Sequence, residues 1–143
     1  MFAPLPARAI VTALAAGQGL ASLFIDLNRT HATNPLWPGH ARFHLVWQSL
    51  TQTLVSAVVV ALIWWPGPAA SSRFYLAAVL TAIPMASFFL AFATRASYHG
   101  RLHDPNGIPP LRTHFGNRLI VIDGNTAIVC FASALLIAAV ALF

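Results

Sequence analysis

Two pairs of histidines in this sequence share a spacing that suits metal chelation. His40 and His44 are four positions apart, and so are His99 and His103. On a helix, this spacing places both imidazoles of a pair on one face, where they can hold the same metal ion. Imidazole combined with carboxylate suits iron, zinc, copper or manganese, so we expect a transition-metal site formed by the two pairs. The remaining histidines and the three aspartates are available as further ligands: His31, His114, Asp26, Asp104 and Asp123.

The same residues also support chemistry without a cofactor. A histidine beside an aspartate in a site of low dielectric forms a general acid/base pair. The candidate catalytic residues for such a pair are Asp26, His31, His44 and Asp123. Aromatic side chains available to line the site are Phe43, Trp47, Phe88, Phe92 and Tyr98. Either form of the site predicts an enzyme that oxidises, isomerises or cyclises a lipophilic small molecule.

Non-catalytic interpretations of these residues remain open. Histidine side chains are stable at a membrane surface and at helix ends, where the polar edge of the amphipathic ring can contact water. Asp123 has Arg118 nearby in the chain as an ion-pair partner. The alternative function is a membrane subunit or carrier without catalytic activity, whose histidine- and arginine-rich loops dock a partner.

The composition indicates a membrane protein. Of 143 residues, 58% are hydrophobic and only 8% are charged, whereas about a quarter of the residues of a typical soluble domain are charged. The formal net charge of +5 would suggest nucleic acid as the partner of a soluble protein. Here the bilayer is the expected partner, because membrane proteins concentrate arginine in their loops. The sequence does not fix the oligomeric state.

Four apolar stretches are long enough to cross a bilayer. A transmembrane helix needs about 20 mostly apolar residues. The stretches that qualify are 9–25, 45–65, 74–92 and 119–143. Pro66 and Pro68 should end the second stretch, and Pro84 should kink the third. We therefore predict an all-α protein, a single integral membrane domain folded as a four-helix bundle.

Four spans place both long loops, 26–42 and 93–118, on one side of the membrane. Six of the eight arginines fall on that side, which by the positive-inside rule predicts cytoplasmic loops and both termini on the opposite side. All six histidines and all three aspartates fall there as well. The sequence therefore predicts one polar site at the cytoplasmic face, where the two histidine pairs meet.

Polar residues recur every three or four positions within three of the spans, so each set shares one helix face. The sets are Gln18, Ser22 and Asp26; His40, His44, Gln48, Gln52 and Ser56; and Asp123, Thr126, Cys130 and Ser133. We expect these faces to point into the bundle, because an unsatisfied polar atom in hydrocarbon costs several kcal/mol.

The segment DLNRTHATNPLWPGHARFH, residues 26–44, resembles the signature of a family of small four-helix membrane proteins of unknown function. The pattern is D-x-N-x-T-H, then N-P-x-W, then H-A-x-F-H, and this segment fills every position of it. The resemblance implies four spans and a loop that characterises the family, but no activity. From the residues themselves, Asn34 before Pro35 and the turn at Pro38-Gly39 predict a rigid loop that fixes His40 and His44 over the end of the bundle.

Overall fold

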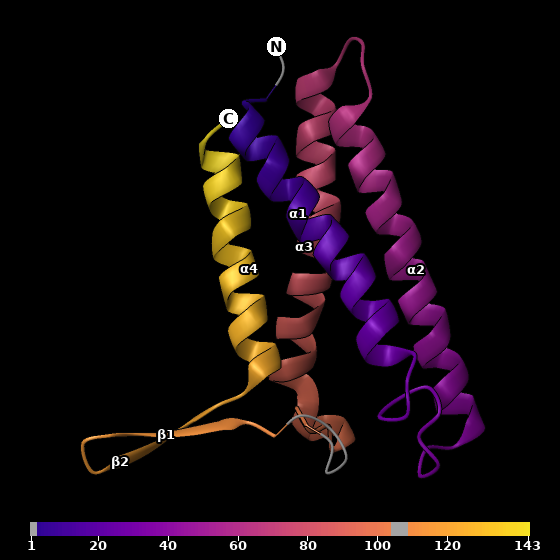
Figure 1. Ribbon diagram of the computed structural model, residues 1–143, viewed down its shortest axis with the longest axis vertical. Coiled ribbons are helices and arrows are strands. Elements are labelled where there is room, and N and C mark those ends of the chain that lie inside the picture. The colour runs from indigo at the N-terminus through magenta and orange to yellow at the C-terminus, as the bar shows by residue number, and fades with distance from the viewer. Residues whose placement is uncertain (1–2, 104–108) are drawn as a thin grey trace.

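The computed structural model describes residues 3–103 and 109–143, and within them it shows four helices and a β-hairpin (Figure 1). The helices are α1 (Leu5–Ala21), α2 (Gly39–Trp64), α3 (Ala70–Thr94) and α4 (Gly124–Ala141). A π-helical turn, Ser22–Asp26, extends α1, and a 3-10 turn, Arg95–Tyr98, extends α3. All four helices are long and apolar enough to cross a membrane. The prediction of an all-α, multi-pass four-helix membrane bundle is confirmed.

Prolines set several of the helix ends. Pro38 has extended backbone and immediately precedes α2, and Pro66 follows the end of that helix. Pro84 lies inside α3, as expected. The start of α2 at Gly39 is earlier than the predicted start at residue 45, so His40 and His44 both lie on the helix.

The hairpin was not predicted, and it corrects the start of the fourth span. β1 (Leu111–Phe115) pairs antiparallel with β2 (Arg118–Ile122), so the predicted start of a helix at residue 119 is wrong. The run Leu119–Ile122 continues the apolar sequence of α4, and hydropathy alone does not separate the two elements. Its β-branched residues favour a strand, and Gly116, with φ of 59°, forms the tight turn that closes the hairpin.

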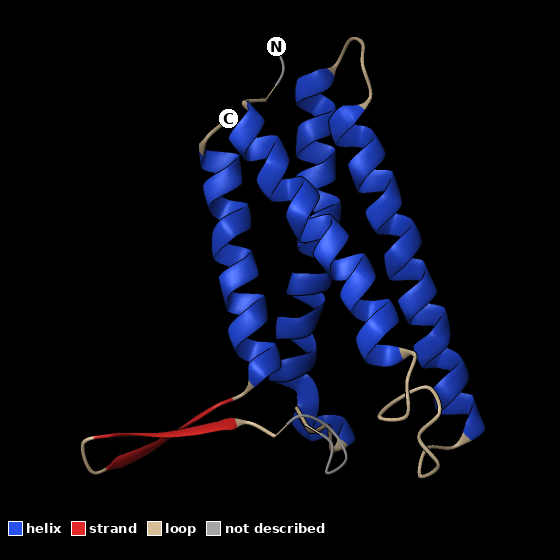
Figure 2. Cartoon of the chain, viewed as in Figure 1, coloured by secondary structure: helices blue, strands red, loops and turns tan. Residues whose placement is uncertain are grey.

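Both α2 and α4 pack against α1 and α3, and they lie on opposite flanks of that central pair (Figure 1). The chain termini and the α2–α3 turn lie at one end of the bundle. The loop after α1, the 3-10 turn and the hairpin lie at the other end, which we call the loop end (Figure 2). The prediction that both long loops share one side of the membrane therefore agrees with the arrangement of the helices.

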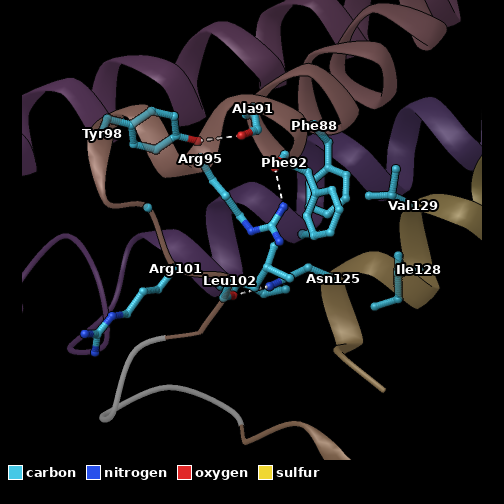
Figure 3. Close-up of a pocket in the computed structure, with 13 residues that line it drawn as sticks. Phe88, Ala91, Phe92, Arg95, Tyr98, Arg101, Leu102, Asn125, Ile128 and Val129 are labelled. Atoms are coloured by element: carbon cyan, nitrogen blue, oxygen red, sulfur yellow. Dashed lines mark hydrogen bonds between the residues drawn. The ribbon is translucent and has the colours of Figure 1, made fainter. Parts of the chain in front are cut away.

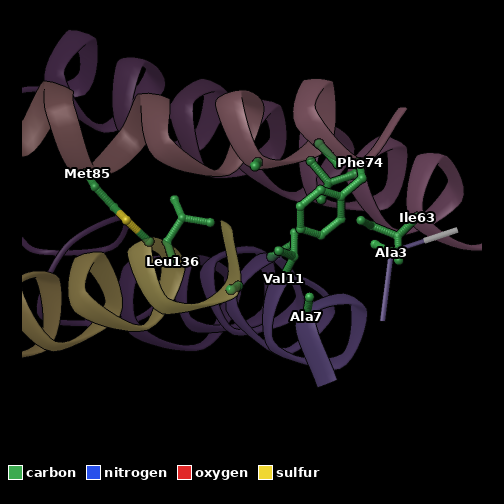
Figure 4. Close-up of a cluster of buried hydrophobic side chains, with 12 residues drawn as sticks. Ala3, Ala7, Val11, Ile63, Phe74, Met85 and Leu136 are labelled. Atoms are coloured by element: carbon green, nitrogen blue, oxygen red, sulfur yellow. The ribbon is translucent and has the colours of Figure 1, made fainter. Parts of the chain in front are cut away.

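Buried apolar side chains concentrate toward the end of the bundle that carries the termini (Figure 4). They come from the first four turns of α1, the last turns of α2 and α4, and mainly the first half of α3. On α1 they are small and recur every four residues, at Ala7, Val11 and Ala15, followed by buried Gly19. Small residues at this spacing let two helix backbones approach closely. The loop end has far fewer buried apolar side chains.

Side-chain hydrogen bonds join α1 to its neighbours in the middle of the bundle. Gln18 Nε2 donates to the carbonyl oxygen of Thr81 on α3 at 3.1 Å, and Gln52 Nε2 of α2 donates to Gln18 Oε1 at 3.4 Å. Thr53 Oγ1 donates to the carbonyl oxygen of Gly19 at 3.2 Å. The polar face of α1 therefore points into the bundle, as predicted, and these contacts hold the three helices in register.

Candidate functional site

The loop between α1 and α2, residues 27–38, is organised by its own side chains; we call it the signature loop. Asn34 is only 1% exposed. Its Nδ2 donates to the carbonyl oxygen of Thr30, and its Oδ1 accepts from the backbone N–H of Leu36, both at 3.0 Å. Arg42 Nε, on the first turn of α2, donates to the carbonyl oxygen of Trp37 at 2.9 Å. The prediction of a rigid loop thus has a physical basis in a buried amide, which connects both halves of the turn.

Hydrogen bonds within this loop fix the tautomer of His31. Asn28 Nδ2 donates to the carbonyl oxygen of Phe24, which orients the amide so that Oδ1 accepts from the backbone N–H of Thr30. Thr30 Oγ1 lies 2.6 Å from Asn28 Oδ1, which can only accept, so the single hydroxyl proton of Thr30 goes to Asn28. Thr30 Oγ1 is also 2.7 Å from His31 Nδ1 and must accept there. Neutral His31 therefore carries its proton on Nδ1, and Nε2 keeps a lone pair for a proton or a metal ion.

His40 and His44 form a close pair on the exposed face of α2. Their Nε2 atoms are 3.0 Å apart, and the ring of His44 stacks on Trp47. The predicted pairing of the two imidazoles is therefore present. The prediction that this polar face points into the bundle is wrong for His40, His44 and Gln48, which are exposed. The buried residue at this level of α2 is instead Ser49.

Asp26 closes the helical extension of α1 and is held by serines. Its Oδ2 accepts from Ser22 Oγ and from Ser49 Oγ, both at 3.2 Å. Among the described residues, Asp26 has no basic or histidine partner, and the two serine hydroxyl groups satisfy its carboxylate instead.

The second histidine pair does not lie on a helix, which corrects the prediction from its spacing. The 3-10 turn ends at Tyr98, and His99 adopts a left-handed conformation with φ of 55°. His99 and His103 are both exposed, in the segment that leaves α3. Gly100 fits closely under the ring of Tyr98, and a Cβ there would lie 2.3 Å from Tyr98 Cε2. This close packing turns the chain away from the helix axis.

The described residues contain no group of three or more histidine, cysteine or acidic side chains that could hold a metal. The two histidine pairs are not gathered at one point, because His40 and His44 project from α2 and the other pair follows α3. His114 lies on β1. Asp104 lies outside the described residues. Only His40 and His44 come together as the predicted metal ligands.

The sequence suggested that Asp123 lies inside the last span, but Asp123 is instead a helix cap. It immediately precedes α4, and its Oδ1 accepts from the backbone N–H of Thr126 at 3.0 Å and lies 3.2 Å from Thr126 Oγ1. Asp123 forms no ion pair with Arg118 among the described residues. A carboxylate at this position stabilises the helix through the first-turn N–H groups and the macrodipole. Its predicted catalytic role stays a prediction.

A cavity of about 460 Å³ opens at the loop end between α1, α3 and α4 (Figure 3). We call it the crevice. Its walls are mostly apolar and include Ile25, Phe88, Phe92, Ile128 and Val129. Figure 1 shows α1 leaning away from α4 toward this end, and both Ile25 and Ile128, which line the crevice, are exposed. The crevice is therefore open to the surroundings of the bundle.

Two arginines, Arg95 and Arg101, line the crevice. Figure 3 shows the Arg101 side chain extending away from the apolar walls, so Arg95 is the cation that lies against them. Its guanidinium carbon lies 4.0 Å from the centre of the Phe92 ring, and Nη1 donates to the Phe92 carbonyl oxygen at 2.6 Å. No carboxylate in the described part of the chain pairs with it. Nearby polar groups are already engaged: Tyr98 donates its hydroxyl proton to the Ala91 carbonyl, and Asn125 Nδ2 donates to the Leu102 carbonyl (Figure 3). From the sequence, Arg95 was one of six loop arginines expected to orient the chain in the membrane or to dock a partner.

No protein-family model, curated protein or solved structure matches the chain. We therefore infer the roles of the residues described above from the geometry and chemistry of the chain itself.

Proposed function

We propose that the protein binds a lipophilic small molecule with an anionic head group in the crevice. The observation that carries this proposal is the guanidinium of Arg95, which lies at an apolar cavity without a carboxylate partner among the described residues. The cavity has the volume of a typical small-molecule site. A ligand anion could take up the guanidinium donors that Phe92 leaves unused, while the ligand's apolar part contacts Phe88, Ile128 and Val129.

The position of the crevice supports a ligand that arrives from the bilayer. An amphiphile already lies with its head group at the membrane surface, near the helix ends, and its chain beside the helices. It would reach Arg95 by moving sideways between α1 and α4. By the positive-inside rule, we place this end of the bundle at the cytoplasmic face.

Binding to the purified protein tests the proposal. A fluorescent long-chain fatty acid should bind the detergent-solubilised protein more tightly than the corresponding alcohol. Arg95→Gln should weaken binding of the acid by about tenfold or more, because a hydrogen bond to a charged group contributes about 1.5–3 kcal/mol. The alcohol should bind the variant and the parent protein equally.

Arg29→Gln is the matched control, since Arg29 lies on the signature loop and does not line the crevice. It removes one cation from the same end of the bundle and should leave acid binding unchanged. Equal binding of acid and alcohol to the parent protein would contradict the proposal.

The crevice lining contains no histidine or aspartate, so binding there requires no chemistry. This geometry favours a non-catalytic protein such as a carrier, although the alternative predicted from the sequence was a subunit or carrier whose histidine- and arginine-rich loops dock a partner. Acid/base or metal-dependent catalysis at the signature loop is the second candidate. It is favoured by one observation, the fixed tautomer of His31, which leaves Nε2 available as a base or a ligand.

The tautomer itself is testable. Thr30→Val removes the acceptor at His31 Nδ1, and the ring should then populate both neutral tautomers. The ¹⁵N chemical shifts of the His31 ring, measured by NMR above the pH at which the ring is protonated, report this change directly. Thr33→Val is the control, because Thr33 is exposed on the same loop. A Thr30→Val spectrum identical to that of the parent protein would show that Thr30 does not select the tautomer.

A further inference from the structure

We propose that the β-hairpin lies flat on the bilayer surface and binds anionic phospholipid head groups through its arginines. This inference is independent of the ligand in the crevice. It gives a role to an element whose second strand hydropathy assigned to a membrane span.

The connection to α4 keeps the hairpin at the membrane surface. Only Asp123 separates the last residue of β2, Ile122, from the first residue of α4. The 18 residues of α4 rise about 27 Å, and the hydrocarbon core is about 30 Å thick. The whole of α4 is therefore needed to cross the core, and Ile122, the last residue of β2, must lie at the edge of the core.

The direction of the hairpin fits this position. In Figure 1, the hairpin projects sideways from the loop end, away from the bundle and across the direction of the helices. An element that extends sideways from membrane-spanning helices runs along the membrane. In the isolated chain all ten residues of the two strands are exposed.

The strand register divides these ten residues into an apolar and a mixed face. Facing residues on adjacent strands share one side of the sheet, and residues two apart along a strand do the same. The apolar face contains the pairs Leu111–Ile122, Thr113–Ile120 and Phe115–Arg118. The opposite face contains the pairs Arg112–Val121 and His114–Leu119.

This distribution suits the region between lipid tails and water. A two-stranded hairpin is at best marginally stable in water on its own, so its apolar face needs a cover. Lipid beside α4 supplies one without any further protein. Arg112 lies on the mixed face, and Arg118 lies on the apolar face at its turn end. A long arginine side chain at the edge of an apolar face can extend to the head groups, so both can reach lipid phosphates. Anionic head groups attract such juxtamembrane arginines.

Spin labels on the two faces test the inference in full-length protein. Cys130 is the only cysteine, so Cys130→Ala provides a background for single labels at Phe115→Cys and His114→Cys. These neighbours face opposite sides of the hairpin. In vesicles of phosphatidylcholine and phosphatidylglycerol, the label at 115 should be more accessible to oxygen than to a water-soluble nickel chelate. The label at 114 should show the reverse.

Two further variants keep the result decisive. Ile120→Cys repeats the measurement on the apolar face in case the change at Phe115 disturbs the hairpin. In the parent protein, added phosphatidylglycerol should move the label at 115 deeper into the bilayer. The double variant Arg112→Gln, Arg118→Gln should abolish this change in depth. Equal access of the nickel chelate to labels on both faces would overturn the inference. So would labels on the apolar face that stay accessible to the chelate until another protein is added. A depth at 115 that does not respond to phosphatidylglycerol would overturn the binding of anionic head groups.

Discussion

Replacing Gly19 by leucine is expected to destabilise the bundle by about 3 kcal/mol, the upper part of the range for overpacked helix contacts. A Cβ at Gly19 would lie 2.9 Å from Ser56 Cβ, closer than real side-chain contacts allow. The added side chain must push α2 away from α1. The hydrogen bond from Thr53 to the carbonyl oxygen of Gly19 would then lengthen as well. Thermal unfolding of the detergent-solubilised protein measures the loss.

Gly17→Leu is the matched control for this change. It lies in the same helix two residues earlier, and a Cβ there meets nothing within 4 Å. Both substitutions remove a helical glycine and add the same side chain, so their difference reports the contact between α1 and α2. Equal stability of the two variants would show that the helices do not approach closely at Gly19.

Asn34→Ala should disorder the signature loop. The substitution removes the buried amide that bonds to both the carbonyl oxygen of Thr30 and the backbone N–H of Leu36. A hydrogen bond contributes about 0.5–1.5 kcal/mol net, so the loss of both costs about 1–3 kcal/mol. That cost is large enough for the loop to open while the four helices remain folded. Hydrogen–deuterium exchange should show faster exchange of the amides of residues 27–38 by at least tenfold.

Asn117→Ala serves as its control, because Asn117 is exposed in the turn of the hairpin. It should leave exchange in the signature loop unchanged. If Asn34→Ala also left that exchange unchanged, the buried amide would not be what holds the loop.

Much of the fold was predictable because the bilayer imposes simple requirements on the chain. The long apolar stretch ended by Pro66 identifies the end of α2 within one residue, whereas the helix begins at Gly39, six residues before the predicted start. The hairpin was missed because its second strand is as apolar as the helix that follows. The turn at Gly116 and the β-branched run before Asp123 carried the missing signal. Aspartate is a favoured N-cap residue, so Asp123 also marked the true start of α4 at Gly124.

The candidate site was only partly predictable. Spacing along one helix correctly paired His40 with His44. The same spacing failed for His99, because the packing of Gly100 under Tyr98 ends the helix before it. The crevice is built from three helices and a loop, and no local pattern joins residues as distant in sequence as Ile25, Arg95 and Ile128.

The uneven distribution of buried side chains gives the two ends of the bundle different mechanical properties. More apolar side chains are buried at the end that carries the termini than at the loop end. Regions with few buried apolar contacts open at low free energy. We therefore expect the loop end to open more readily than the other end, which would let the space beside Phe88 and Val129 widen for hydrocarbon chains of different length.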